Sequence, residues 1–203
     1  MSLSYNDSNS VVNYTDSSAS ARLTNRLSGL FRALPPGKRI VVLCVGTDRS
    51  TGDSLGPLTG SLLSKYRSSS FDLYGTLEKP VHAMNLDDTL EQLYLRSDDP
   101  YVIGIDACLG NVGSIGTVQI VDGPLRPGAG VNKSLTPVGD IHISGIVNVG
   151  GLLGYHVLQN TRLHLVMSMA SLISRSLYVA LSIKASEDRE FQIPIERDRE
   201  ATP

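Results

Sequence analysis

Two continuous apolar runs constrain the fold of this chain more than any other feature. Residues 40–45 read IVVLCV between Arg39 and Gly46, and residues 101–106 read YVIGID. Short runs of β-branched and aliphatic residues without polar alternation are typical of strands that are buried on both faces of a parallel sheet. We therefore expect both runs to form central strands, with helices covering the two faces.

The rest of the chain alternates between helical and strand patterns. Apolar residues at helical spacing predict helices over 21–34, 54–66 and 87–95, and one long helix over 152–183 with a break near Asn160. Further strands are expected at 71–74, at 116–122 as an edge strand, and at 141–149. This alternation predicts an α/β fold, in which three αβα layers enclose a mostly parallel central sheet.

Composition divides the chain into three parts. Residues 1–20 are rich in Ser, Asn and Asp, which predicts a flexible N-terminal arm. Residues 21–185 are long enough to bury one sizeable core, so we expect a single α/β domain there. Residues 186–203 form a polar C-terminal tail that is expected to fray.

Charge and cysteine content exclude several classes of partner and compartment. The formal net charge is −2 and the basic residues are scattered, so neither a nucleic-acid groove nor a membrane-surface patch is expected. Gly, Ser, Arg or Asn interrupts each apolar stretch, so no membrane span is expected. Cys44 and Cys108 lie in apolar runs without a paired framework, and the N-terminus lacks a secretion pattern. A cytoplasmic location is therefore predicted.

Two acidic residues stand where an α/β sheet binds its ligands, beyond the carboxyl ends of the strands. Asp53 closes the loop VGTDRSTGDSLGP after the first run, and Asp106 ends the second run. If these strands are neighbours, both carboxylates face one crevice, where one tends to stay protonated and the other ionised. Such a pair can activate water against an amide carbonyl and protonate the leaving nitrogen, and it can equally bind a divalent cation.

Each acid also has a purely structural explanation. Asp53 can cap the following helix, although Ser54 could cap it instead. Asp106 can accept hydrogen bonds from loop amides. In the same loop, Gly46 and Gly52 are expected to allow a tight chain path.

The remaining candidates are weaker. Cys108 with His142 could form a nucleophilic pair, although a small buried hydrophobe is the commoner role for such a cysteine. The four histidines lack a zinc spacing, and an open metal site with the two aspartates and one distant His, His142 being the candidate, stays an alternative. Tyr155 and the methionines at 167 and 169 are expected to pack within helices.

Three motifs, in order along the chain, carry a resemblance to a known family. GDSLGPLTG (52–60), VIGIDACLG (102–110) and RPGAGVNKS (126–134) resemble the spore germination protease family. The chain as a whole most closely resembles the YyaC-type sporulation proteins, relatives of that protease, over roughly residues 39–158. The resemblance implies a phosphorylase/hydrolase-like fold shared with hydrogenase maturation proteases.

The resemblance also implies an activity. Asp53 and Asp106 would be the catalytic pair of an unusual aspartic-type peptidase that hydrolyses small proteins, with small acid-soluble spore proteins as candidate substrates. Substrate-binding roles are expected for four further residues: Asp48 and Arg49 on the loop rim, and Asn132 and Lys133 in a loop near the site. Arg49 and Lys133 could equally be solvated loop charges.

The chain also departs from these relatives. It is shorter than the germination protease and shows no counterpart of its cleavable propeptide. In hydrogenase maturation proteases an acid at the position of Asp53, the Asp at the position of Asp106 and a later His bind nickel, whereas LTPVGD stands at that later position here. We therefore expect no metal and no other cofactor. A catalytically inactive regulatory protein of sporulation, a metal-binding protein and a homo-oligomer stay open alternatives.

Overall fold

The computed structural model describes residues 10–66, 70–128 and 135–192. Its strands are β1 Val11–Asn13, β2 Ile40–Cys44, β3 Phe71–Tyr74, β4 Tyr101–Gly110, β5 Thr117–Asp122 and β6 Ile141–Val149. Its helices are α1 Ala19–Arg32, α2 Leu55–Leu63, α3 Leu86–Arg96, α4 Gly154–Gln159 and α5 Leu163–Gln192, with two short 3₁₀ turns, η1 Gly52–Ser54 and η2 Val112–Ser114.

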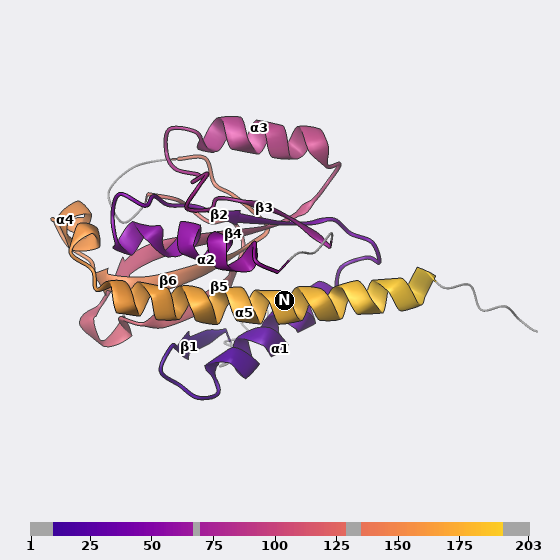
Figure 1. Cartoon of the computed structure of the whole chain (residues 1–203), viewed down its shortest axis with the longest axis horizontal. Coiled ribbons are helices and arrows are strands. Elements are labelled where there is room, and N and C mark those ends of the chain that lie inside the picture. The colour runs from indigo at the N-terminus through magenta and orange to yellow at the C-terminus, as the bar shows by residue number, and fades with distance from the viewer. Residues whose placement is uncertain (1–9, 67–69, 129–134, 193–203) are drawn as a thin grey trace, which may run out of the picture.

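The six strands form one sheet in the order β1-β5-β6-β4-β2-β3. The contacts of β2 with β3 and β4, and of β4 with β6, are parallel, whereas β5 runs antiparallel to both β6 and β1. Helices α1, α2 and α5 cover one face of the sheet and α3 covers the other (Figure 1). The three-layer α/β fold predicted from the sequence is confirmed.

The sheet is buried on both faces, as its continuous apolar runs require. Along β2, Val42 and Cys44 face the core beneath α1, α2 and α5, whereas Val41 and Leu43 face the core beneath α3. All five residues of β2 are buried. Parallel strands of this kind lack polar alternation because neither face meets water.

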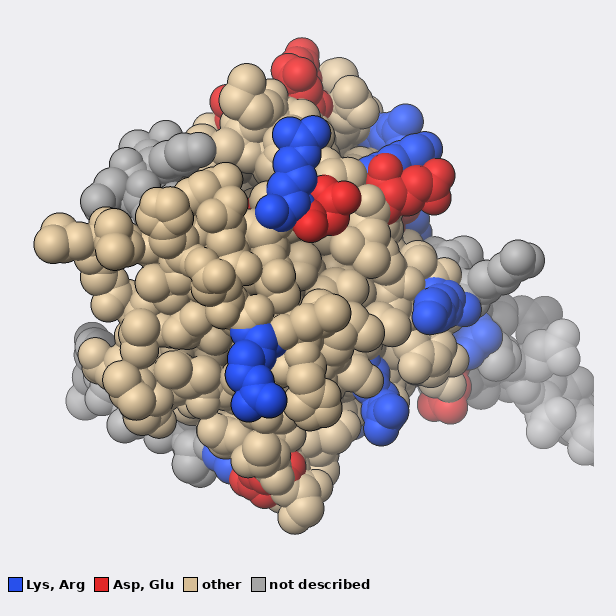
Figure 2. Space-filling view, turned by 60° about the vertical axis from the view of Figure 1, so that its left-hand side comes forward, with Lys and Arg blue, Asp and Glu red and all other residues tan. Residues whose placement is uncertain are grey.

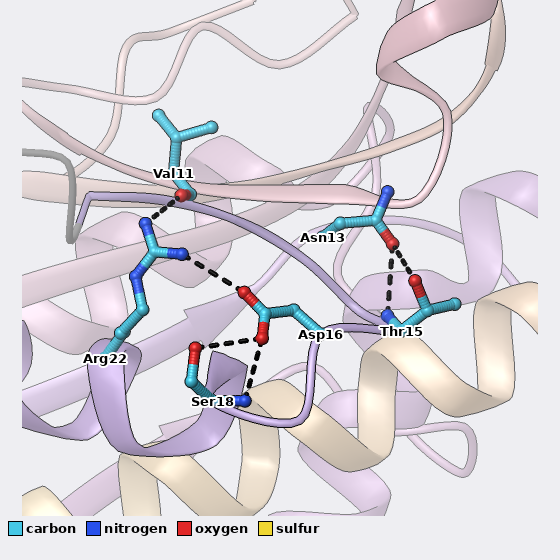
Figure 3. A network of polar contacts seen from close by, with 6 residues as sticks. All are labelled: Val11, Asn13, Thr15, Asp16, Ser18 and Arg22. Atoms are coloured by element: carbon cyan, nitrogen blue, oxygen red, sulfur yellow. Dashed lines mark hydrogen bonds and ion pairs between the residues drawn. The ribbon is translucent and has the colours of Figure 1, made fainter.

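Residues 10–20 of the predicted N-terminal arm are more ordered than their composition predicts, and residues 1–9 lie outside the described residues. Residues 11–13 form β1 on the edge of β5, so β5 is not the edge strand that we expected. The Asp16 carboxylate accepts hydrogen bonds from the backbone and hydroxyl of Ser18, and Arg22 donates to both Asp16 and the Val11 carbonyl oxygen (Figure 3). These local bonds join β1 to the start of α1 and offset the entropy of ordering a polar segment.

The C-terminal helical region agrees with the prediction in one respect and differs from it in another. The sequence pattern predicted a break near Asn160, and the structure has it between α4 and α5. However, α5 continues through residues assigned to the polar tail as far as Gln192, and residues 193–203 lie outside the described residues. Lys184 supports this part of α5, because its buried ammonium donates to the Leu34 carbonyl oxygen and to the Asp188 carboxylate.

Helix α5 also bears on the expectation that no segment spans a membrane. Residues 163–191 are long and apolar enough to cross a membrane, by length and composition only. Within it, Arg175 lies on the exposed side of the helix, while Met169 and Ile173 pack into the core. Half of an apolar 18-residue stretch of this helix is buried inside the molecule, so the helix is weak evidence for a membrane span.

Candidate functional site

Strand β4 extends beyond the end of its neighbour β2, and this difference in length creates the site. The ladder between them ends where the Val45 N–H donates to the Ile105 carbonyl oxygen, at 2.7 Å. Strand β4 continues to Gly110, so Asp106 lies within the strand and not at its end. The loop after β2 fills the place beside Asp106, and η1 of that loop packs against β4.

Gly46 turns the chain into this loop. Its φ of +140° is one that residues with a side chain rarely adopt, and a Cβ atom there would lie 2.0 Å from the carbonyl oxygen of Asp53. The same oxygen accepts a hydrogen bond from the Thr47 N–H at 3.2 Å. The loop therefore closes on itself and carries Asp53 back toward β4.

Gly52 serves a different purpose from the one expected. Its φ is not positive, but a Cβ atom there would lie 2.8 Å from Leu158 Cδ2 and 2.9 Å from Thr161 Oγ1. Gly52 therefore allows η1 to approach the end of α4 closely. Close approach, and not backbone conformation, is the reason for a glycine at this position.

Asp53 is not the N-cap of α2. Ser54 occupies the N-cap position, although its side chain makes no capping hydrogen bond, and Asp53 precedes it within η1. The Ser54 hydroxyl donates to the Thr51 carbonyl oxygen at 2.6 Å, which stabilises the turn. Asp53 is half-buried and lines the cavities described below.

Asp106 is the more buried acid of the pair, with 8% of its surface exposed. Burial raises the pKa of Asp106 well above its ordinary value, and the nearby Asp53 carboxylate raises it further. The hydrogen bond from the Ala107 N–H to Asp106 Oδ1, at 2.8 Å, acts in the opposite direction. Asp106 thus holds its proton, and the Asp53 carboxylate lies close enough to oppose the ionisation of Asp106.

Two hollows meet at this pair of carboxyl groups. The first, here called the strand hollow, has a volume of about 330 Å³ and lies against β4 and β6. The second, here called the loop hollow, has a volume of about 300 Å³ and lies between the loop after β2, residues 82–84 and α4. Asp53 and Asp106 line both hollows, so a group at the junction contacts both acids.

The two hollows differ in their walls. The strand hollow is lined by Cys108, Leu125, His142 and Ser144, among others. The loop hollow combines polar residues with large apolar ones: Thr47, Arg49, Ser50, His82, Met84, Leu135, Tyr155 and Leu158. An extended ligand that crosses the junction would therefore meet a different set of side chains on each side of the two acids.

The structure describes only part of the substrate-binding set expected from the sequence. Arg49 lines the loop hollow, whereas Asp48 is exposed and lines neither hollow. Asn132 and Lys133 lie outside the described residues. The catalytic and substrate-binding roles of these residues stay predictions.

Cys108 and His142 both line the strand hollow, but the protonation of the Cys108 thiol does not favour a nucleophilic pair. Burial, together with the nearby Asp106, raises the pKa of the Cys108 thiol to about 11. His142 Nδ1 lies 2.9 Å from the Gly123 carbonyl oxygen, which can only accept, so Nδ1 carries hydrogen and donates to it. A thiol that stays protonated at neutral pH is a poor nucleophile.

The residues present fit a metal ion poorly. Within the described ranges, no group of three His, Cys, Asp or Glu side chains is placed to hold one. Leu135, from the LTPVGD segment, lines the loop hollow and offers no donor atom. We therefore derive no metal-dependent step.

Several residues of the site were not identified from the sequence. Tyr155 was expected to pack within a helix, but it is 60% exposed and lines the loop hollow. Of the two methionines with the same prediction, Met169 is in the core as expected, whereas Met167 is 38% exposed. Ser50, His82 and Met84 were not proposed for the site at all. Only Ser50 carried a usable signal, because it stands three residues before Asp53 at the start of a helix, a spacing that places two side chains on one side.

Comparisons with known proteins agree with this fold. The chain matches the model of the DUF1256 family, described as a protein of unknown function, over residues 11–176. It is 53% identical over 166 residues to the uncharacterized protein YyaC of Bacillus subtilis (strain 168), which covers 82% of this chain and 80% of that protein.

Among solved structures, the chain is similar to the [NiFe] hydrogenase maturation protease HycI from Thermococcus kodakarensis KOD1, with a TM-score of 0.53 and 17% identity. The match covers 76% of this chain and 99% of that chain, and at this identity it shows the fold alone. The chain therefore belongs to the DUF1256 family, as a YyaC-like protein whose α/β fold is similar to that of a hydrogenase maturation protease.

Proposed function

We propose that this protein is a cytoplasmic peptidase of sporulating or germinating cells that hydrolyses peptide bonds with Asp53 and Asp106. The observation that carries the proposal is the buried Asp106 carboxyl group, which holds its proton beside Asp53 at the junction of two hollows. Perturbed acids in a cavity are candidates for acid and base catalysis.

The two acids have different tasks in this reaction. Asp53 takes a proton from a water molecule as the water oxygen attacks the carbonyl carbon of the peptide bond. Asp106 then gives its proton to the amide nitrogen as the carbon–nitrogen bond breaks, which releases an amine and a carboxylic acid. Transfer of a proton from Asp53 to Asp106 restores the starting state.

The biological setting is the less direct part of the proposal. It is supported by the three motifs that resemble the spore germination protease family, and by similarity in fold to a protein named as a hydrogenase maturation protease. Small acid-soluble spore proteins are the substrates that this resemblance suggests. A cytoplasmic location is consistent with two unpaired cysteines, Cys44 and Cys108.

The test is cleavage of small acid-soluble spore proteins and of a mixed peptide library, followed by mass spectrometry. We expect the wild-type protein to release discrete fragments with or without chelator, and Asp53→Asn and Asp106→Asn to release none. Asp98→Asn is the matched control, because Asp98 is exposed and lines neither hollow. Circular dichroism of each variant separates loss of activity from loss of folding.

Three outcomes contradict parts of the proposal. If the wild-type protein releases no fragments from either source, the peptidase assignment is wrong. If fragments persist in both aspartate variants, the carboxylate pair does not carry the reaction. If library peptides are cut and spore proteins are not, the peptidase assignment holds and the suggested substrate is wrong.

A further inference from the structure

One hydroxyl group in the strand hollow is accessible and unpaired. Ser144, on β6, is part-buried and lines this hollow, and its side chain has no hydrogen-bond partner among the residues that the structure describes. In the same part of the chain, the fully enclosed side-chain atoms without a partner belong to Arg26, Ser28 and Ser50. The Ser144 hydroxyl oxygen is not among them, so a molecule bound in the strand hollow can reach it.

The sheet holds Ser144 beside Asp106. In the parallel ladder between β4 and β6, Ser144 is the direct partner of Asp106, and neighbouring strands lie about 5 Å apart. The preceding residues, Ile105 and Ile143, pack into the core beneath α1, α2 and α5. Because side chains alternate along a strand, Asp106 and Ser144 both project from the opposite face, where the strand hollow lies.

We propose that the Ser144 hydroxyl donates a hydrogen bond to the carbonyl oxygen of the peptide bond that is cleaved. This assignment rests on the peptidase function proposed above. As water attacks the carbonyl carbon, this oxygen becomes negatively charged, and a donor that is already in place lowers the barrier. Asp106 protonates the nitrogen in that reaction. The nitrogen and oxygen of one amide are bonded to the same carbon, so they need two adjacent groups, as Asp106 and Ser144 are.

The uncharged neighbours of Ser144 in the strand hollow are less suited to this task. Because His142 Nδ1 donates to the Gly123 carbonyl oxygen, Nε2 of the neutral ring carries no hydrogen and cannot donate. The thiol of Cys108 is a weak donor. The hydroxyl of Ser144 is a strong donor on a short side chain, and its strand is paired on both sides, with β4 and β5.

Cationic side chains near the site are few and solvated. Arg49 and Arg126 line the hollows, but both are exposed, so ordering either long side chain on a substrate would cost conformational entropy. Figure 2 shows the end of the molecule that carries α4, where charged side chains are few and scattered over a broad uncharged surface. A fixed neutral donor is therefore the better stabiliser of the charge that develops on the carbonyl oxygen.

Replacing Ser144 by alanine tests the contact on the shortest library peptide that the wild-type protein cleaves. We expect kcat to fall about 10- to 100-fold with KM unchanged, because the hydrogen bond is strong only when the oxygen is charged. The fold should not change, since the Ser144 side chain bonds to no described residue. Ser144→Thr keeps the hydroxyl on a residue type that suits a strand, and should keep most of the wild-type kcat.

Ser168 provides a matched control for Ser144. It is also part-buried, and its side chain has no hydrogen-bond partner among the described residues, but it lies on α5 and lines neither hollow. Ser168→Ala should leave kcat and KM unchanged. The pH profile of kcat/KM should keep its shape in Ser144→Ala and be lowered equally at every pH, because the acids themselves are intact.

A second measurement requires no turnover of substrate. An analogue of the cleaved peptide in which the reacting carbonyl group is reduced to a methylene group lacks the oxygen that Ser144 contacts. This analogue should inhibit the wild-type protein and Ser144→Ala with the same inhibition constant. A weaker inhibition of Ser144→Ala would place the contact elsewhere on the peptide and overturn the inference.

The remaining outcomes separate the role of Ser144 from the peptidase function. If the wild-type protein cleaves peptide and Ser144→Ala cleaves it with the same kcat, the role of Ser144 alone is refuted. A pH profile that is displaced along the pH axis would show that Ser144 acts through the ionisation of Asp106, which also overturns the inference. If the wild-type protein cleaves no peptide, the peptidase function is refuted and the role of Ser144 with it.

Discussion

Substitution of Gly46 by alanine should destabilise the protein in two ways: the alanine would adopt a strained backbone angle, and its Cβ atom would collide with a carbonyl oxygen. A Cβ atom at residue 46 would lie 2.0 Å from the Asp53 carbonyl oxygen, more than an ångström inside ordinary contact. The positive φ alone is expected to cost about 1–3 kcal/mol. Displacing the carbonyl would also break its hydrogen bond with the Thr47 N–H, which adds about 1 kcal/mol.

Gly37 and Gly29 are matched controls for this experiment. Gly37 has a φ of +76° and nothing within 4 Å of a Cβ atom, so Gly37→Ala measures the angle without a collision. Gly29 lies within α1, also in open space, so Gly29→Ala should stabilise the protein by about 0.5–1 kcal/mol. The expected order of stability is Gly29→Ala, wild type, Gly37→Ala, Gly46→Ala.

Urea unfolding followed by circular dichroism measures these differences, since the chain has no tryptophan to report by fluorescence. We expect Gly46→Ala to lower the free energy of unfolding by about 2–4 kcal/mol before the cost of the collision itself is added. Gly46→Ala should also lower the rate of peptide cleavage by more than the loss of folded protein explains, because the collision moves Asp53. A Gly46→Ala protein no less stable than Gly37→Ala would refute this account of the loop.

Two further predictions concern ionisation at the site. Because the pKa of Asp106 is raised in the folded state, its ionisation destabilises the wild-type protein as pH rises from about 4 through the folded pKa, so Asp106→Asn should gain stability relative to wild type over that interval. Thermal melts from pH 4 to pH 8 measure the difference, and a constant difference would contradict it. Because the pKa of the Cys108 thiol is about 11, its alkylation by iodoacetamide at pH 8 should be at least about 100-fold slower than that of free cysteine. Mass spectrometry of a Cys44→Ala protein isolates Cys108, and labelling at the rate of free cysteine would exclude a raised pKa.

The layers of this fold can be predicted well from the sequence, because strands that are buried on both faces consist of continuous apolar residues. IVVLCV and YVIGID lie in β2 and β4, which are parallel neighbours, and this pairing is what brings Asp53 and Asp106 to common cavities. The position of β1 could not be predicted in the same way. Its three residues follow a polar stretch, and its place depends on β5 and on side-chain bonds around Asp16.

The walls of the site were harder to predict than its acids. Tyr155 and Met84 have the apolar character of core residues, and only the path of the chain leaves them exposed at the loop hollow. Ser50 lies in a polar loop where nothing in the sequence indicates burial. Local patterns record whether a residue suits a helix or strand, but they do not record which distant segments will enclose it.

The edge formed by β1 also bears on how the chain reaches its native state. Val11 pairs with Gln119, so β1 is synthesised more than 100 residues before its partner strand. Contacts this distant in sequence slow folding, because a long loop must close before they can form. The outer edge of the sheet should therefore be completed late, and amide hydrogen exchange during refolding should show β1 becoming protected after β2 and β4.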